Sequence, residues 1–352
     1  MLNPLPVDIS QVHKILVIKL RAIGDVLLST AVLPDLRKAF PDAAIDFLTE
    51  KPSRQVVEGN PEISSAIVYD GRKQNGAGLI ADIRGRKYDL VIDLFGNPRS
   101  ALVTLFSGAR YRVGYRFGWR RYCYNIVVTP RGGEVHNIDF NLDALRAIGI
   151  PVGHPTASFT IDAEAEAFAE RFYSGSGLDC RSVVALNPGG GWYTKRWPSC
   201  QYVALGGMLA EKYNTQIIVL WGPGEQETAR EIISQMRSKA LLIPAADLKQ
   251  LAAIIKQCAA MVTNDSGPMH IAAAVGTPVL AIFGPTIPDL QGPVGDKHVV
   301  IQNQKLVCLG CNDTVCPIEN PCMEQLDADV VFRAFGQLVE KNRLFHQVQS
   351  TS

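Results

Sequence analysis

Residues 263–286, TNDSGPMHIAAAVGTPVLAIFGPT, constrain the fold of this chain more than any other stretch. An apolar run at 259–262 precedes them, as in a buried parallel strand, and the turn residues at 264–267 end that run. Pro268 suits the first position of a helix, where a missing N–H group costs nothing. A second apolar run follows at 279–283. The stretch therefore predicts a strand, a tight loop, a short helix closed by a glycine, and another strand.

This arrangement puts a helix N-terminus at the carboxyl end of a strand. Free N–H groups and the positive end of the helix dipole suit a phosphate there. Asp265 and His270 flank the same opening. An ordinary strand–helix–strand unit with Asp265 as a local cap fits the spacing equally well, so the stretch alone leaves both interpretations open.

Length and composition limit what the rest of the chain can be. With 352 residues, two domains are expected, and 47% apolar against 20% charged residues is typical of globular proteins. The net charge of +1 argues against a dedicated nucleic-acid binder. No apolar run approaches the ~20 residues of a membrane span, and the start MLNPLPVDISQVHK lacks the pattern of a signal peptide. A cytoplasmic protein is expected, whose cysteines are thiols or metal ligands rather than disulfides.

The first half alternates strands with helices, which predicts right-handed strand–helix–strand units and a parallel sheet. Strands are expected at 14–20, 44–48, 66–69 and 88–95, and helices at 26–40 and 134–148. The half is Rossmann-like, but no G-x-G-x-x-G follows its first strand, which counts against a dinucleotide cofactor.

Asp25 follows the first strand, where the first helix begins. It is either a helix cap or a carboxylate at the strands' carboxyl ends, kept ionised by the helix dipole as a general base requires. Glu50 and Asp93 also stand near strand ends and are the rival candidates for this role.

Residues 110–124, RYRVGYRFGWRRYCY, form the one strongly basic stretch. Arginines between aromatic residues suit a phosphorylated glycan, an anionic membrane surface or single-stranded nucleic acid. A solvated arginine-rich loop is the alternative. Arg116, Arg120 and Arg121 are the residues of this stretch that we expect to bind such a glycan acceptor.

The second half repeats the pattern after a linker at 151–158. Strands are expected at 182–186, 216–221 and 241–244, with helices at 199–210 and 247–259. The loop 187–198, NPGGGWYTKRWP, again follows a strand. Its three glycines let backbone N–H groups approach a phosphate, and Lys195 and Arg196 add positive charge. The loop favours a phosphate site over a flexible connection.

Three stretches resemble glycosyltransferase family 9, the heptosyltransferases of lipopolysaccharide inner-core synthesis, and the resemblance covers roughly 13–340. They are residues 14–50 (KILVIKLRAIGDVLLSTAVLPDLRKAFPDAAIDFLTE), 187–198 and 264–286. The resemblance implies an α/β protein with the GT-B fold, in which two Rossmann-like parallel-sheet domains face each other across a cleft that holds the active site. It also implies an inverting transfer of heptose from ADP-heptose to a core hydroxyl, with no cofactor or metal required.

The resemblance assigns roles to single residues. Asp25 falls on the family's proposed catalytic base, Lys195 on the lysine at the donor diphosphate, and Asp265 on the aspartate that holds the donor sugar. Glu225, in the loop GPGEQE, falls near the acidic residue that binds the nucleotide ribose. The remaining donor-site residues are Gly190, Ser266, Gly267, Met269 and His270, of which Ser266, Gly267 and Met269 offer backbone N–H groups. His270 matches the motif, and a packing role is equally open for it.

Four cysteines lie close together in the sequence CLGCNDTVCPIENPC. They are Cys308, Cys311, Cys316 and Cys322. Their density and the C-x-x-C start suit structural zinc or an iron–sulfur cluster, while the unequal later spacings and a reducing compartment suit plain thiols. The sequence leaves both open.

These expectations combine into a domain plan and a function. The acceptor-side domain is expected at 1–158 and the nucleotide-sugar-binding domain at 159–325. A terminal helix within 326–352 is expected to pack back on the first domain, before a frayed tail after Phe345. The expected function is heptosyl transfer to a glycolipid acceptor at the cytoplasmic face of the inner membrane, without nucleic acid. The alternatives are a family member that uses another nucleotide sugar, a nucleotide-sugar epimerase, and a nucleotide-sugar-binding or nucleic-acid-binding module without turnover.

Overall fold

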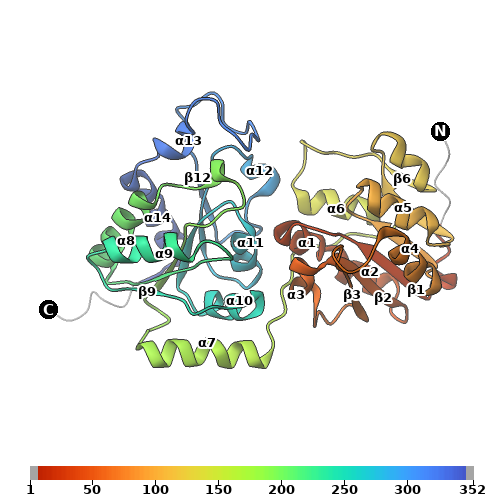
Figure 1. The fold of residues 1–352 in the computed structure, drawn as a ribbon, viewed down its shortest axis with the longest axis horizontal. Helices are drawn as coiled ribbons and strands as arrows, with labels where there is room; N and C mark the ends of the chain where they lie inside the picture. Colours follow the sequence, from red (N-terminus) through yellow and green to blue (C-terminus); the bar gives the residue numbers. More distant parts are fainter. Residues whose placement is uncertain (1–6, 346–352) are drawn as a thin grey trace. The chain divides into compact units, whose positions relative to one another are not determined.

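The computed structural model describes residues 7–345, which divide into two compact units between Thr160 and Ile161. Each unit contains a six-stranded sheet whose paired strands are all parallel (Figure 1). The predicted fold class of two Rossmann-like parallel sheets is confirmed. Within the described residues, no helix combines the length and the apolar character that a membrane span requires.

The first sheet has the order β3-β2-β1-β4-β5-β6, which is the doubly wound order of a Rossmann fold. Its strands are β1 (Lys14–Ile18), β2 (Ala44–Glu50), β3 (Ser65–Tyr69), β4 (Leu90–Asp93), β5 (Tyr111–Tyr115) and β6 (Ile126–Val128). The central strands β1 and β4 are apolar and almost completely buried, as strands covered on both faces must be.

Two groups of helices accompany this sheet. α1 contacts α3 and α6, and α2 contacts α6, while α4 packs against α5. The helices are α1 (Ile23–Ser29), α2 (Val32–Ala39), α3 (Arg54–Val57), α4 (Gly76–Gly85), α5 (Pro98–Phe106) and α6 (Asn137–Arg146). Short 3-10 helices occur at η1 (Ile9–Gln11), η2 (Lys51–Ser53) and η3 (Gly118–Cys123).

The single helix predicted at 26–40 is wrong, because the structure has α1 and α2 in its place. Thr30 and Ala31 separate the two helices. Pro34 has no N–H group to donate to the Thr30 carbonyl, so Leu33 donates to that carbonyl instead (N···O 2.9 Å). The helix therefore breaks just before the proline.

The second sheet repeats the winding order as β12-β11-β10-β7-β8-β9. Its strands are β7 (Val183–Asn187), β8 (Gln216–Val219), β9 (Ala240–Leu242), β10 (Ala260–Asn264), β11 (Val279–Ile282) and β12 (Val299–Ile301). The apolar runs predicted as strands in this half all overlap these elements. A ligand site at the switch between β7 and β10 is the general expectation for this winding.

The helices of the second unit also form two groups. α8 contacts α9 and α14, whereas α10 contacts α7 and α11 (Figure 1). They are α7 (Ala163–Ser176), α8 (Ser199–Tyr213), α9 (Gln226–Gln235), α10 (Leu248–Lys256), α11 (Gly267–Ala274), α12 (Pro288–Gln291), α13 (Pro321–Glu324) and α14 (Ala328–Asn342). A 3-10 helix, η4, spans Tyr193–Lys195.

The terminal helix α14 belongs to the core of the second unit. Val331, Phe335 and Leu338 are completely buried there, in the same cluster as residues of α8, β11 and β12. These side chains of α14 therefore pack within the second unit. The tail expected after Phe345 lies outside the described residues.

Candidate active site

Three loops of the second unit lie at the carboxyl ends of neighbouring strands. One follows β7 and includes η4, one follows β8 and reaches Glu225, and one joins β10 to α11. Because β8, β7 and β10 are adjacent and parallel, these loops meet at one edge of the sheet. These loops and the first turn of α11 contain every donor-binding residue that the resemblance implies.

Lys195 and Asp265 form a buried ion pair between two of these loops. Lys195 Nζ lies 2.6 Å from Asp265 Oδ2, with side-chain exposures of 14% and 5%. Thr286 Oγ1 donates a second hydrogen bond to the same oxygen (2.7 Å). The ammonium also lies over the ring of Trp192, 4.4 Å from its centroid. The pair thus combines a fixed carboxylate with a cation beside a glycine-rich loop.

Two asparagines that the sequence analysis did not select hold the loops together. Asn264 Nδ2 donates to the carbonyls of Pro188 and Gly189 (2.9 and 3.1 Å). Asn264 Oδ1 accepts from the Trp197 N–H and the Tyr202 hydroxyl. Each asparagine is the last residue of a buried strand, and this position was the available signal.

Asn187 makes the matching contacts from the other strand. Its Nδ2 donates to Thr263 Oγ1 (2.9 Å) and Ser266 Oγ (3.0 Å). With both amides in place, the glycine loop is fixed to the loop that carries Asp265.

Glu225 binds the backbone of its neighbours. Its carboxylate accepts from the N–H groups of Gly190 (3.1 Å) and Gly222 (2.9 Å). A Cβ at Gly189 would displace this carboxylate from its present position. The Gly190 N–H expected to face a phosphate therefore points to Glu225, which links the first two loops.

The N-terminus of α11 completes this edge. Ser266 is the N-cap, but its side chain makes no capping bond. Its hydroxyl accepts a hydrogen bond from the Asn187 amide instead. The helix begins at Gly267, one residue before the predicted start at Pro268, which still lies in its first turn. Met269 is completely buried, and its N–H donates to the Ser266 carbonyl (3.1 Å). His270 is buried as well, so packing accounts for both side chains.

Asp25 of the first unit lies in the first turn of α1, where β1 leads into the helix. Its Oδ2 accepts a hydrogen bond from the Ala22 N–H (3.3 Å), so it caps the helix as one interpretation expected. The side chain is half-buried. The rival Glu50 pairs with Arg99 (3.2 Å). The rival Asp93 is fully buried and is engaged by Tyr124.

A buried lysine near Asp25 was also not selected from the sequence. Lys19 Nζ donates to the Leu94 carbonyl (3.0 Å). Burial lowers the pKa of Lys19, against the opposing attraction of Asp25 and Asp93. Burial likewise raises the pKa of Asp93, although hydrogen bonds from Gly96, Tyr124 and other groups oppose the shift.

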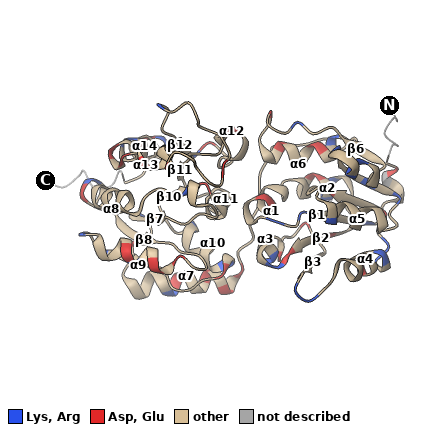
Figure 2. Ribbon diagram, turned by 45° about the horizontal axis from the view of Figure 1, so that its top comes forward, with Lys and Arg blue, Asp and Glu red and all other residues tan. Residues whose placement is uncertain are grey.

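The basic stretch 110–124 is not one loop. Its first part is β5, where Tyr111, Val113 and Tyr115 are buried. Its second part is η3, which precedes β6, and blue segments lie beside β6 in Figure 2. The exposed aromatic residues of η3 are Trp119 (53%) and Tyr122 (71%).

The three arginines proposed for the acceptor lie in this second part and just before it. Arg116 and Arg121 are exposed, and Arg120 lies over the Phe117 ring, 5.4 Å from its centroid. Arg121 stacks on Tyr122 in the same way (4.6 Å). The result is a basic and aromatic surface on the first unit.

The structural metal that the sequence left open at the four cysteines receives no support. In the part of the chain that the structure describes, no three His, Cys, Asp or Glu side chains are placed to hold a metal ion. All four cysteines are free thiols, and Cys322 is buried. Burial, with the neighbouring Cys308, Cys311 and Cys316, raises the pKa of Cys322 to about 11.

Comparison with known proteins gives a consistent assignment. Residues 77–321 match the model of "Glycosyltransferase family 9 (heptosyltransferase)". Lipopolysaccharide heptosyltransferase 2 of Escherichia coli K12 is 28% identical over 312 residues, 82% of this chain and 88% of that protein. Lipooligosaccharide heptosyltransferase 2 of Haemophilus influenzae is 27% identical over 310 residues, with the same shares.

Solved structures show the same fold. A family 9 glycosyltransferase from Veillonella parvula superposes with a TM-score of 0.83 at 26% identity, covering 94% of this chain and 97% of that one. ADP-heptose lps heptosyltransferase II of E. coli gives 0.75 at 24% identity, covering 94% and 99%. The fold is therefore GT-B. The match over most of the chain identifies this protein as a member of glycosyltransferase family 9 and as a glycosyltransferase.

Proposed function

We propose that the protein transfers heptose from ADP-heptose to a hydroxyl group of the lipopolysaccharide inner core, with inversion at the anomeric carbon. The observation that carries this proposal is the Lys195–Asp265 pair, fixed where three strand-end loops meet. The relatives named as lipopolysaccharide heptosyltransferases 2 support the choice of sugar and acceptor.

The second unit would bind the donor. The diphosphate is a dianion, which matches the Lys195 ammonium and the N-terminus of α11. Asp265, held by Lys195 and Thr286, would accept hydrogen bonds from hydroxyl groups of the donor sugar. Glu225 lies one loop away and would contact the ribose. No metal is required in this scheme, because the lysine and the helix N-terminus neutralise the departing diphosphate.

The first unit would provide the base. The acceptor O–H proton passes to the Asp25 carboxylate while the acceptor oxygen bonds to the anomeric carbon. The bond from that carbon to the donor phosphate oxygen breaks at the same time, and ADP leaves with the electron pair. Because attack and departure occur on opposite faces, the anomeric configuration inverts. A positioned base contributes roughly 10²- to 10⁴-fold to such a step.

The acceptor carries negative charge and is attached to a membrane. The exposed Arg116 and Arg121, with Trp119 and Tyr122, have the chemistry to bind an anionic glycolipid at the membrane surface. We place the protein on the cytoplasmic face of the inner membrane in this reaction, where it acts as a peripheral enzyme.

The variant Asp25→Asn tests the proposed base. Asparagine keeps an oxygen acceptor for the Ala22 N–H, so the fold and donor affinity should persist. Turnover should fall by roughly 10²- to 10⁴-fold. Asp42→Asn, at an exposed position, is the matched control and should remain active. Near-normal turnover of Asp25→Asn with a lower melting temperature would restrict Asp25 to capping α1.

A further inference from the structure

A segment that follows the last strand of the second sheet returns to the donor loops. Residues 302–313, called the strap from here on, come directly after β12 and consist of turns and irregular backbone. Leu306 and Leu309 pack against the core, whereas Val307 and residues 311–313 are exposed. Apolar burial therefore accounts for the middle of the strap, and hydrogen bonds fix where its ends lie.

Two N–H groups of the strap bind the loop that follows β11. The Gly310 N–H donates to the Gly284 carbonyl (3.4 Å), and the Asn312 N–H donates to the Pro285 carbonyl (2.6 Å). Gly310 has a φ of +75°, and a Cβ there would lie 2.7 Å from Ile287 Cγ1. Both the left-handed backbone and the close approach favour glycine at this position.

The next carbonyl of the same loop belongs to Thr286 and accepts from Gln302 Nε2 of the strap (3.4 Å). Thr286 is almost completely buried, and its hydroxyl donates to Asp265 Oδ2 (2.7 Å). Gln302 therefore holds the backbone of the residue whose side chain holds the Asp265 carboxylate.

The other end of the strap binds the loop that carries Lys195. Thr194 Oγ1 donates to the Asp313 carbonyl (2.8 Å), and Thr194 is almost completely buried. Thr194 belongs to η4 and directly precedes Lys195, whose ammonium pairs with Asp265. The strap thus binds next to both members of the Lys195–Asp265 pair.

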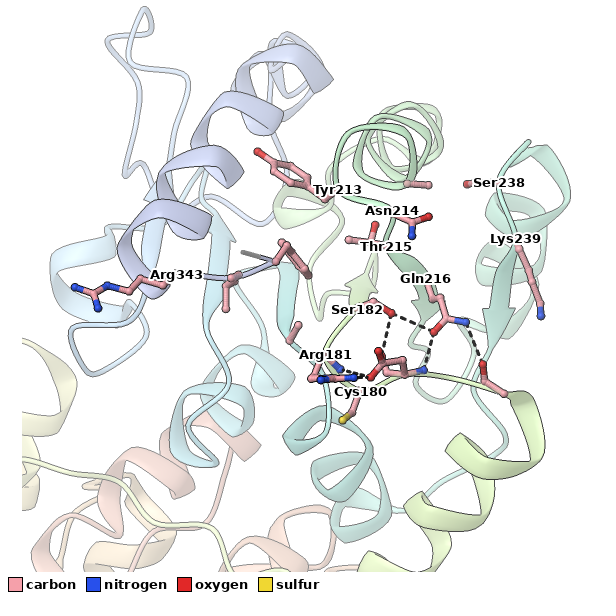
Figure 3. Close-up of a pocket in the computed structure, with 16 residues that line it drawn as sticks. Cys180, Arg181, Ser182, Tyr213, Asn214, Thr215, Gln216, Ser238, Lys239 and Arg343 are labelled. Carbon is pink, nitrogen blue, oxygen red and sulfur yellow. Dashed lines mark hydrogen bonds and ion pairs between the residues drawn. The ribbon is translucent and has the colours of Figure 1, made fainter. Parts of the chain in front are cut away.

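The strands that carry these loops are fixed by other contacts. At their amino ends, Gln216 Oε1 accepts from Ser182 Oγ (3.3 Å) and from the Asp179 N–H (2.7 Å), as Figure 3 shows. Near their carboxyl ends, the amides of Asn187 and Asn264 join the loops. The contacts of the strap therefore add to a sheet that is already held together, and they act on the loops at the donor edge.

We propose that the strap positions the donor site, with Thr194 and Gln302 as its positioning residues. Thr194 fixes the backbone from which the Lys195 side chain extends, and Gln302 fixes the backbone of Thr286. The ammonium and the carboxylate are thereby held in one arrangement before the donor binds, which lowers the cost of ordering them on binding. This inference rests on the proposed function, because that proposal assigns the donor to Lys195 and Asp265.

Two substitutions of Thr194 test the inference. Thr194→Val removes the hydroxyl at nearly constant volume, whereas Thr194→Ser keeps it. In titration calorimetry, ADP-heptose should bind about three- to tenfold more weakly to Thr194→Val, the scale of one neutral hydrogen bond, and nearly as in the wild type to Thr194→Ser. The KM for the acceptor should stay unchanged in both. Thr314→Val, at an exposed threonine just beyond the strap, is the matched control and should bind as the wild type does.

A double-mutant cycle shows whether Thr194 acts through Lys195. Adding Thr194→Val to Lys195→Ala should weaken donor binding less than about twofold further, because the group that Thr194 positions is gone. In the same way, Gln302→Leu should weaken binding about threefold in the wild type and no further in Thr286→Val. Gln304→Leu, at an exposed glutamine of the strap, is the control for that substitution.

The outcomes separate this inference from the proposed function. A wild type that binds no ADP-heptose would overturn both. A wild type that binds ADP-heptose, with equal affinity in Thr194→Val, would overturn the strap alone. Equal weakening in Thr194→Ser and Thr194→Val, or the same factor with and without Lys195, would show that Thr194 only supports the fold and would also overturn its positioning role.

Discussion

Replacing Lys195 by methionine separates the structural from the functional role of the Lys195–Asp265 pair. Methionine keeps much of the apolar stem of lysine but removes the ammonium that lies 2.6 Å from Asp265 Oδ2. It leaves the Asp265 carboxylate, which is 5% exposed, with Thr286 as its remaining side-chain donor among the described residues.

Two effects of different size are expected. Breaking a fully buried pair costs about 3–5 kcal/mol, but Lys195 is 14% exposed and Thr286 still donates to Asp265. We therefore expect a loss of about 1–3 kcal/mol in the free energy of unfolding of the second unit. Donor binding loses a hydrogen bond to a charged group, about 1.5–3 kcal/mol, or roughly 10- to 150-fold in Kd.

The double variant Lys195→Met/Asp265→Asn distinguishes these effects. Neutralising Asp265 removes the buried charge, so most of the lost stability should return, while donor affinity should stay low. Urea denaturation measures the first quantity, and titration calorimetry with ADP-heptose the second. Lys212→Met, at an exposed lysine, is the control. Wild-type affinity for ADP-heptose in Lys195→Met would refute the role of Lys195 at the diphosphate.

Two further predictions concern the basic surface and the cysteines. Neutralising Arg116, Arg120 and Arg121 together should raise the KM for the acceptor roughly tenfold, with donor affinity unchanged, and salt should weaken acceptor use in the wild type. Micromolar binding of short nucleic acids at this surface would contradict the glycolipid interpretation. Cys322, with its pKa raised to about 11, should be alkylated slowly at pH 8 and about tenfold faster per pH unit until that value, because only the thiolate reacts. Peptide mass spectrometry measures this against the exposed Cys311, and equal rates for both at pH 8 would contradict the burial of Cys322.

The sequence predicted nine of the twelve strands in the described residues, with the loops that follow them, and missed β5, β6 and β12. Apolar runs between turn residues identify buried parallel strands, and the loop residues at their carboxyl ends then fall together by topology. The order of strands in the second sheet accounts for the contact between Lys195 and Asp265, which are 70 positions apart in the sequence. The resemblance to family 9 supplied their roles, which the pattern alone left open.

Other features depend on contacts that no local pattern encodes. The amides of Asn187 and Asn264 act through partners on a neighbouring strand or loop, so neither stood out from other turn residues. A third of the basic stretch became β5, because alternating aromatic and valine side chains are buried there despite the arginine between them. The break at Pro34 did have a local signal, which the apolar periodicity of 26–40 concealed.

The proposed activity is the transfer of heptose from ADP-heptose to a lipopolysaccharide core acceptor. Its most direct test incubates the protein with a panel of nucleotide sugars and lipopolysaccharide core acceptors, and follows nucleoside diphosphate release together with acceptor mass. We expect ADP release from ADP-heptose that requires the core acceptor, with a heptose added for each ADP released. Preferential release from another nucleotide sugar, or donor binding without any acceptor-dependent release, would contradict it.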